Sequence, residues 1–353
     1  MASYAHISML RCHRVWRILP ISRTLARIMN FTHQSDIAAL RLQLNADIVG
    51  QTALLDRLVI GLLTGGHLLL EGLPGLAKTT AVKALAARVD ASFQRIQFTP
   101  DLLPGDLTGT EVFNPMDGSV RFVRGPLFHD IVLADEINRA PAKVQSALLE
   151  AMQERQVTVN GLTHELPPLF LVLATQNPLE QAGTYPLPEA QLDRFLLHVR
   201  LDYPQADEEL RILQLHMQAN HPIRSITGRD AEHPINLSAV LTARQEVLQV
   251  HVAESLQRAI VDLVRATRQP QQHVARLAGM VTAGASPRAA LALADAARAL
   301  AYLRGRDFVL PDDVIALAPD VLRHRIVLSL DAGLQAMSAD ALIADLLAAT
   351  VWP

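Results

Sequence analysis

Residues 72–80 of this chain are Gly72-Leu73-Pro74-Gly75-Leu76-Ala77-Lys78-Thr79-Thr80, and this stretch decides the fold. It follows a compact apolar run at residues 67–70, typical of a buried parallel strand, and it opens a segment with helical periodicity. A glycine-rich turn in that position directs successive N–H groups, and the positive end of a helix dipole, at phosphate oxygens. Such a loop places Lys78 at the β- and γ-phosphates and the Thr79 hydroxyl at Mg²⁺.

One position departs from the strict phosphate-loop pattern, because Ala77 stands where glycine is usual. The Cβ of alanine disfavours the left-handed region of the backbone map. We therefore expect a negative φ at Ala77.

Polar residues follow two further apolar runs, at positions that suit a metal and an attacking water. Asp135 and Glu136 come directly after residues 131–134. We expect Asp135 to hold Mg²⁺ and Glu136 to polarise the water, since ligands bind at the carboxyl ends of strands in open α/β sheets. Asn177 comes three residues after the run at residues 169–174, and an amide there can orient water against the γ-phosphate.

Alternating strand and helix patterns predict an α/β fold. The strands expected at residues 67–70, 93–98, 131–134, 169–174 and 195–201 are separated by helical segments, which predicts a parallel five-stranded sheet in a three-layer αβα core. We expect the Asn177 strand between the phosphate-loop strand and the Asp135 strand. Two hairpins interrupt this order, one around Asp117-Gly118 and one around Asn160-Gly161.

Two arginines lie near predicted element boundaries, and their sequence positions leave their roles open. Arg194 precedes the fifth strand, which we place at the sheet edge away from the phosphate loop. It is either a solvated surface charge or a group that reaches a neighbouring subunit's phosphate. Arg288 begins a helix, where the dipole disfavours a cation, and this indicates either a phosphate contact or a surface charge.

We predict three segments. Residues 1–34 form a basic leader, because no acidic residue occurs before Asp36 while arginine recurs; it is either an organelle transit peptide or a disordered or non-native extension before a start at Met29. Residues 35–205 form the nucleotide-binding αβα domain with its two hairpin inserts. Residues 206–353 form an all-helical domain.

Composition narrows the function further. The net charge of −3 lacks the basic surplus of a duplex binder, so nucleic acid is not the expected partner. The single cysteine, Cys12, allows no internal disulfide, and no run of about 18–20 apolar residues is present to span a bilayer. The histidines form no zinc-binding pattern. We expect a cytoplasmic protein.

Together these motifs resemble the MoxR branch of the AAA+ ATPases, in the family's order and over residues from about Asp47 to the C-terminus. Ala77 is usual in that family. The resemblance rests on the following segments: residues 71–79, 95–104, 125–128, 133–141, 174–178, 192–195 and 284–288.

The resemblance implies roles that the residues alone leave open. It implies that Val49 and Gly50 lie beside the adenine, that Asn177 is sensor 1, that Arg194 is the arginine finger and that Arg288 is sensor 2. It also implies ATP and Mg²⁺ as cofactors, a ring that is expected to be a hexamer, and chaperone-like remodelling of client proteins, among them von Willebrand A domain proteins.

Three alternatives to a remodelling ATPase stay open. The first is a nucleotide-gated scaffold with little turnover, against which Glu136, Asn177 and Arg194 argue. The second is a DNA-associated motor, against which the acidic balance argues. The third is a motor subunit like that of magnesium chelatase, which is close in fold.

Overall fold

The computed structural model describes residues 31–73, 75–178, 183–219 and 234–353. The predicted leader up to residue 30 and Pro74 of the predicted phosphate loop lie outside these ranges. Residues 31–353 form one compact unit. Within the described part of the chain, no helix has both the length and the apolar character needed to cross a bilayer.

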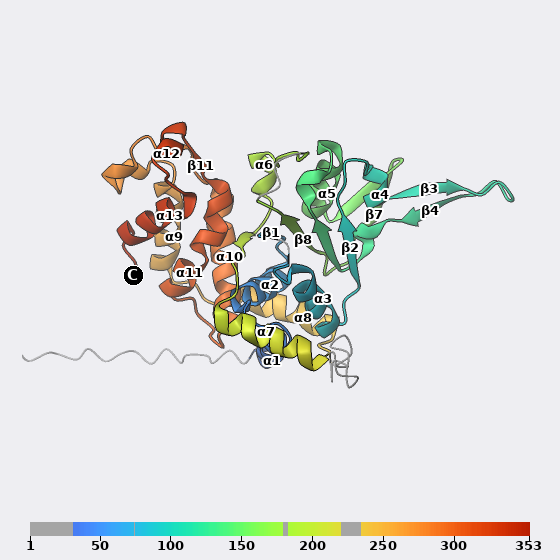
Figure 1. Cartoon of the computed structure of the whole chain (residues 1–353), viewed down its shortest axis with the longest axis horizontal. Coiled ribbons are helices and arrows are strands. Elements are labelled where there is room, and N and C mark those ends of the chain that lie inside the picture. Colours follow the sequence, from blue (N-terminus) through green and yellow to red (C-terminus); the bar gives the residue numbers. More distant parts are fainter. Residues whose placement is uncertain (1–30, 74, 179–182, 220–233) are drawn as a thin grey trace, which may run out of the picture. The chain divides into compact units, whose positions relative to one another are not determined.

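A five-stranded parallel sheet forms the centre of the unit and confirms the predicted fold class (Figure 1). Its spatial order is β2-β5-β8-β1-β9, so β8 lies between β1 and β5 as expected. The strands are β1 (Leu68–Glu71), β2 (Phe93–Gln97), β5 (Ile131–Asp135), β8 (Leu171–Gln176) and β9 (Leu197–Arg200).

The placement of β9 corrects one expectation. It is an edge strand, but it pairs with β1, with Leu68 opposite Leu197, so it lies beside the phosphate-loop strand rather than away from it. The apolar side chains of Leu197 and Val199 join the core on the same face as Leu68 and Leu70, and this fixes the pairing.

Alternate side chains of each strand face the two helical layers. Leu68 and Leu70 of β1 face α1 (Gln34–Asp47), α2 (Thr52–Thr64) and α3 (Lys78–Arg88), whereas Leu69 faces α5 (Ala142–Glu154). This alternation is the two-residue period of a strand buried on both faces.

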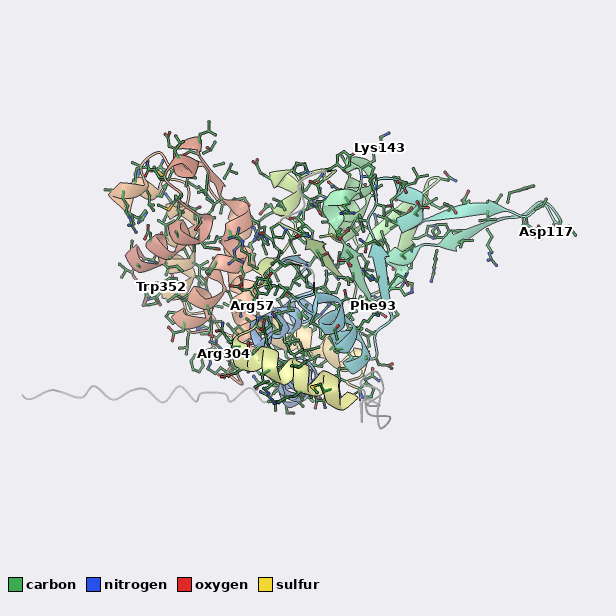
Figure 2. The ribbon with its side chains drawn as sticks, in the orientation of Figure 1. Arg57, Phe93, Asp117, Lys143, Arg304 and Trp352 are labelled. Carbon is green, nitrogen blue, oxygen red and sulfur yellow. The ribbon has the colours of Figure 1, made fainter. Side chains whose placement is uncertain are left out.

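The two predicted hairpins are confirmed. In the first, β3 (Gly109–Phe113) pairs with β4 (Val120–Arg124), and Asp117 lies at its projecting tip (Figure 2). In the second, β6 (Gln156–Val159) pairs with β7 (Leu162–Glu165). Asn160 and Gly161 both have positive φ, as a tight two-residue hairpin turn requires.

Helices dominate the chain beyond residue 206, but strands do not stop there as predicted. The short strands β10 (Val281–Ala283) and β11 (Val327–Leu328) form an antiparallel pair in this region. The helices are α7 (Ala206–Ala219), α8 (Leu237–Leu248), α9 (Glu254–Ala266), α10 (Pro287–Leu303), α11 (Pro311–Leu322), α12 (Leu330–Leu334) and α13 (Ala339–Ala349); the single turns α4 (Pro104–Thr108) and α6 (Glu189–Leu192) precede them.

One apolar core joins the helical region to the sheet. Helices α8 and α10 both contact α2, and their buried side chains belong to the same cluster as Leu68 and Leu70. Residues at the start of the unit join it too: Phe31 packs against Tyr302, and the backbone N–H of Thr32 donates to Glu246 at 2.8 Å. The segment predicted as the leader, residues 1–34, thus includes residues that pack against the rest of the unit.

Candidate functional site

The phosphate loop connects the carboxyl end of β1 to the first turn of α3. The N–H of Gly72 donates to the carbonyl of Gln176 on β8 at 3.3 Å, which ties the loop to the neighbouring strand. The Lys78 ammonium donates back to the carbonyl of Gly72 at 2.6 Å. The side chain that is expected to reach phosphate therefore folds back to the first residue of its own loop.

Ala77 has a φ of 55°, so the expectation of a negative φ was wrong. It caps α3 from the left-handed region, the conformation that glycine adopts in the strict pattern. The loop must reverse direction within one residue to begin the helix, and this requirement overrides the modest preference of an alanine Cβ.

The two acidic residues lie where β5 ends. Asp135 is the last residue of the strand, and Glu136 follows it with a φ of 58°. Thr175 of β8 connects them, because its hydroxyl donates to Asp135 Oδ1 at 2.5 Å and accepts the N–H of Glu136 at 2.9 Å.

Three side chains that the sequence did not single out bind these carboxylates, two of them on β2. Arg95 on β2 donates from Nε and Nη2 to Asp135 Oδ2, at 3.0 and 2.6 Å. Gln97, two residues along the same strand, donates to Glu136 Oε2 at 2.7 Å, and Arg139 pairs with the same oxygen at 3.2 Å. Only the register of β2 against β5, with Gln97 opposite Asp135, brings these groups together.

The loop, the carboxylates and Asn177 line one cavity of about 360 Å³. Burial lowers the pKa of Lys78, and the nearby carboxylates of Asp135 and Glu136 oppose this shift. The cavity residues are Gly75, Leu76, Ala77, Lys78, Thr79, Thr80, Arg95, Asp135, Glu136, Thr175, Gln176 and Asn177.

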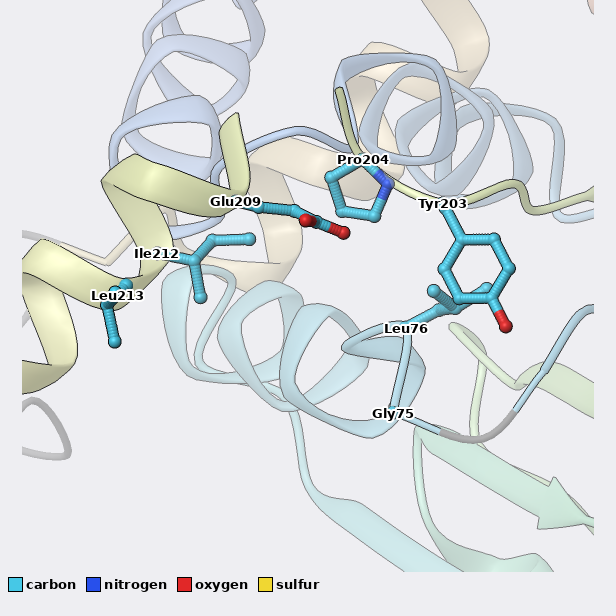
Figure 3. A pocket seen from close by; sticks show the side chains of 7 residues that line it. All are labelled: Gly75, Leu76, Tyr203, Pro204, Glu209, Ile212 and Leu213. Carbon is cyan, nitrogen blue, oxygen red and sulfur yellow. The ribbon is translucent and has the colours of Figure 1, made fainter. Parts of the chain in front are cut away.

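A second, mostly apolar cavity of about 410 Å³ adjoins the first, and both are lined by Gly75 and Leu76 (Figure 3). Its other walls are Tyr203 and Pro204, which precede α7, and three residues of α7 itself: Glu209, Ile212 and Leu213. Val49 and Gly50 are not among the residues that line either cavity, but Gly50 lies against Glu208, the neighbour of Glu209.

Arg194 and Arg288 are not among the residues that line either cavity, and Arg288 lies near the carboxylate of Asp193. Asp193 accepts from the Ser286 hydroxyl at 3.1 Å and pairs with Arg325 at 2.7 Å, and Arg288 approaches it to 4.0 Å. Arg194 is the next residue along the chain. It precedes β9 at the amino ends of the strands, whereas the phosphate loop follows the carboxyl end of β1.

The chain is similar to proteins of one ATPase family. Residues 67–197 match the ATPase family associated with various cellular activities (AAA), and residues 273–346 match an AAA lid domain. The chain is 46% identical over 307 residues to Chaperone MoxR1 of Mycobacterium tuberculosis, covering 87% of this chain and 79% of that protein. It is 34% identical over 299 residues to Protein MoxR of Paracoccus denitrificans, covering 81% and 87%.

The chain belongs to the MoxR family of AAA+ ATPases. A crystal structure of a Cytophaga hutchinsonii protein assigned as an ATPase superposes with a TM-score of 0.84 at 43% identity, and covers 91% of this chain and 96% of that one. More distant similarity reaches a magnesium-chelatase subunit of Arabidopsis thaliana, at 26% identity over 258 residues.

The oxygen donors in this MoxR-family cavity suit Mg²⁺. This ion favours one or two protein oxygens together with substrate phosphates and water, and Thr79 and Asp135 supply a hydroxyl and a carboxylate in one cavity. Thr175 fixes the orientation of that carboxylate through Oδ1. When bound, the metal would neutralise phosphate charge; the chain itself supplies Lys78, the loop N–H groups and Glu136.

Proposed function

We propose that this protein binds Mg·ATP in the polar cavity, hydrolyses it, and uses the cycle to remodel partner proteins. One observation carries the proposal: Lys78, Thr79, Asp135, Glu136 and Asn177 come from three strand ends and line a single cavity. Positioned cations, a metal ligand and a carboxylate base are the parts that phosphoryl transfer to water requires.

The position of each residue in the cavity supports a proposed role. The N–H groups of residues 75–79 and the Lys78 ammonium bind the phosphates, and Thr79 and Asp135 hold the metal. Glu136 accepts a proton from the attacking water, which Asn177 orients. Because Gln97 and Arg139 hold the Glu136 carboxylate in the structure, that residue must exchange a partner for water before it acts.

The apolar cavity suits the nucleotide base. It shares Gly75 and Leu76 with the phosphate-binding cavity, so a nucleotide can extend from one to the other. Mostly apolar pockets with a few polar groups are typical of small-molecule sites. Gly50 supports this site indirectly, because it lies against Glu208 of α7.

Arg194 and Arg288 support assembly into a ring. Arg288 approaches Asp193 to 4.0 Å, Arg194 follows Asp193 in the chain, and neither arginine lines the cavity of the phosphate loop. We infer that both act on the nucleotide of a neighbouring copy, where a guanidinium stabilises charge in the transition state. A hexamer is the arrangement that we propose.

The partner class is inferred from the relatives and from the hairpins. One relative is named a chaperone. The β3–β4 hairpin exposes Phe113 and Met116, at 61% and 92%, and these adaptable apolar side chains suit contact with protein clients. Von Willebrand A domain proteins are the clients that we propose to test first.

A steady-state ATPase assay, with and without such a partner, tests the proposal. Turnover that changes with the partner is the expected result. Tight nucleotide binding without turnover in either condition would instead indicate a nucleotide-gated scaffold, and this outcome would contradict the catalytic part of the proposal.

A further inference from the structure

The contact between Arg95 and Asp135 lies at the position where the metal is proposed to bind. Both Nε and Nη2 of Arg95 donate to Oδ2 of Asp135, while the Thr175 hydroxyl donates to Oδ1. Both oxygens of the proposed metal ligand therefore already accept hydrogen bonds. The Asp135 side chain is only 15% exposed, so its charge depends on these neighbours more than on water.

The arginine is held in place for this contact. Arg95 Nη2 also donates to Gln97 Oε1 at 3.0 Å, and Arg95 and Gln97 lie on the same face of β2. The guanidinium is nevertheless 47% exposed, on the edge strand, and lines the phosphate-binding cavity. It can therefore leave Asp135 for water without moving any backbone.

We propose that Arg95 is a counter-ion of Asp135 and yields this carboxylate when Mg·ATP binds. The inference rests on the proposed function. A guanidinium and a divalent cation that face one carboxylate oxygen repel each other, and the charge of Asp135 cannot fully satisfy both. Arg95 is thus a positioning residue: it holds the Asp135 carboxylate in place through two hydrogen bonds, and it weakens the effect of the metal on nucleotide binding.

The competing role for Arg95 is direct contact with a phosphate. Arg95 would then strengthen nucleotide binding by a similar factor with and without metal. Competition at Asp135 predicts a different pattern, in which Arg95 helps metal-free nucleotide to bind but opposes the metal. The ratio of the dissociation constants in EDTA and in saturating Mg²⁺ separates the two roles, because it measures the coupling between metal and nucleotide.

The experiment measures binding of a fluorescent, non-hydrolysable ATP analogue to the full chain, with EDTA or with saturating Mg²⁺. In Arg95→Gln, which keeps a polar side chain but no charge, the ratio of the two constants should rise about tenfold over the wild type, the usual value of one charge-assisted hydrogen bond. Arg95→Lys, which keeps the charge but loses the two-nitrogen contact, should give an intermediate rise.

Arg258→Gln is the matched control. It removes an equally simple ion pair, with Glu254 on α9, which involves no residue of either cavity. Its ratio should equal that of the wild type. A ratio in Arg95→Gln and Arg95→Lys within twofold of the wild type overturns the inference but leaves the proposed function intact. Absence of Mg²⁺-dependent binding in the wild type overturns both.

Discussion

Three side chains proposed to act on the nucleotide have protein partners in the structure. Lys78 donates to the Gly72 carbonyl, Asp135 accepts from Arg95, and Glu136 accepts from Gln97. Buried polar groups are costly when they lack partners, and these contacts remove that cost. Nucleotide binding must exchange them, and single substitutions should show which ones matter.

Lys78→Ala should abolish ATP binding. It removes the ammonium that the loop directs toward the β- and γ-phosphates, and burial beside phosphate makes that charge hard to replace. Isothermal titration calorimetry with Mg·ATP measures the effect. Lys83→Ala, on the same helix but outside both cavities, is the control and should bind normally. Unchanged affinity in Lys78→Ala would disprove the phosphate-loop assignment.

Glu136→Gln should bind ATP and fail to turn it over. The amide keeps the size of the side chain and a hydrogen-bonding oxygen, but it cannot accept a proton from water. Turnover should fall by roughly 10²–10⁴-fold, the usual contribution of a general base. Steady-state phosphate release and nucleotide affinity are both measured, and turnover within twofold of the wild type would show that another group is the base.

At the scale of elements, strand β1 is fixed at both of its ends. Its carboxyl end leads into the phosphate loop. His67 directly precedes its amino end, and the Nδ1 of His67 accepts the N–H of Val172 at 2.9 Å. His67 Nε2 lies 3.2 Å from the carbonyl of Met152 on α5, so the ring connects β1, β8 and α5. That pattern assigns the proton to Nε2.

The stability of the fold should depend on the neutral state of His67. Burial lowers the pKa of His67 from 6.5 to about 4. The folded pKa lies below the unfolded one, so this stability is complete above about pH 6.5 and is lost as pH falls toward 4. The loss should total about 3 kcal/mol, at about 1.4 kcal/mol per pH unit.

Urea unfolding at several pH values checks this. His67→Gln retains a donor and an acceptor but does not titrate, so its stability should fall less than that of the wild type over this range. The exposed His273→Gln should follow the wild type. Parallel curves for the wild type and His67→Gln would contradict the expected role of this histidine.

The sequence predicted those parts of the fold and site that depend on local patterns. The phosphate loop, the carboxylates after β5 and the Asn160-Gly161 turn each follow from a few adjacent residues, and the structure contains them. Arg95 and Gln97 were missed because their contacts depend on the register of β2 against β5, which no local pattern encodes. The φ of Ala77 was mispredicted because the loop's path, not its residue type, sets it.

The same limit applies to the arginines. Arg288 and Asp193 are far apart in sequence, and only the packing of the start of α10 against the turn before β9 brings them together. We expected a helix to begin at Arg288, and α10 does begin there, at Pro287, but the sequence did not predict what the start of that helix contacts.

At the scale of the whole molecule, the site divides between the two ends of the sheet. Leu68 is the first residue of β1 and pairs with Leu197, the first residue of β9, so Arg194 precedes the amino ends of these strands. The phosphate loop follows Glu71, at the carboxyl end of β1. At about 3.3 Å per residue, the three steps of the four-residue strand β1 put about 10 Å between its two ends, and Arg194 precedes the paired strand at the amino end. Under the role proposed for Arg194, a complete site needs a second copy.

Arg194→Ala should bind ATP almost normally and hydrolyse it poorly. An arginine finger accelerates hydrolysis by roughly 10³–10⁵-fold in other NTPases. Mixing this variant with Lys78→Ala should restore some activity, because an intact phosphate loop can then face an intact Arg194. ATPase assays over a dilution series, with oligomeric state measured by light scattering, provide the test. Full activity in Arg194→Ala, or constant activity per chain down to a proven monomer, would contradict it.

The separation of Arg194 from its own phosphate loop has a consequence for the cell that makes this protein. On the proposed arrangement, a single newly synthesised chain binds ATP but does not hydrolyse it. ATP hydrolysis begins only when copies associate, so its total rate rises more steeply than in proportion to the amount of protein. The concentration of the protein then controls its activity, and a modest change in synthesis or degradation can turn hydrolysis on or off.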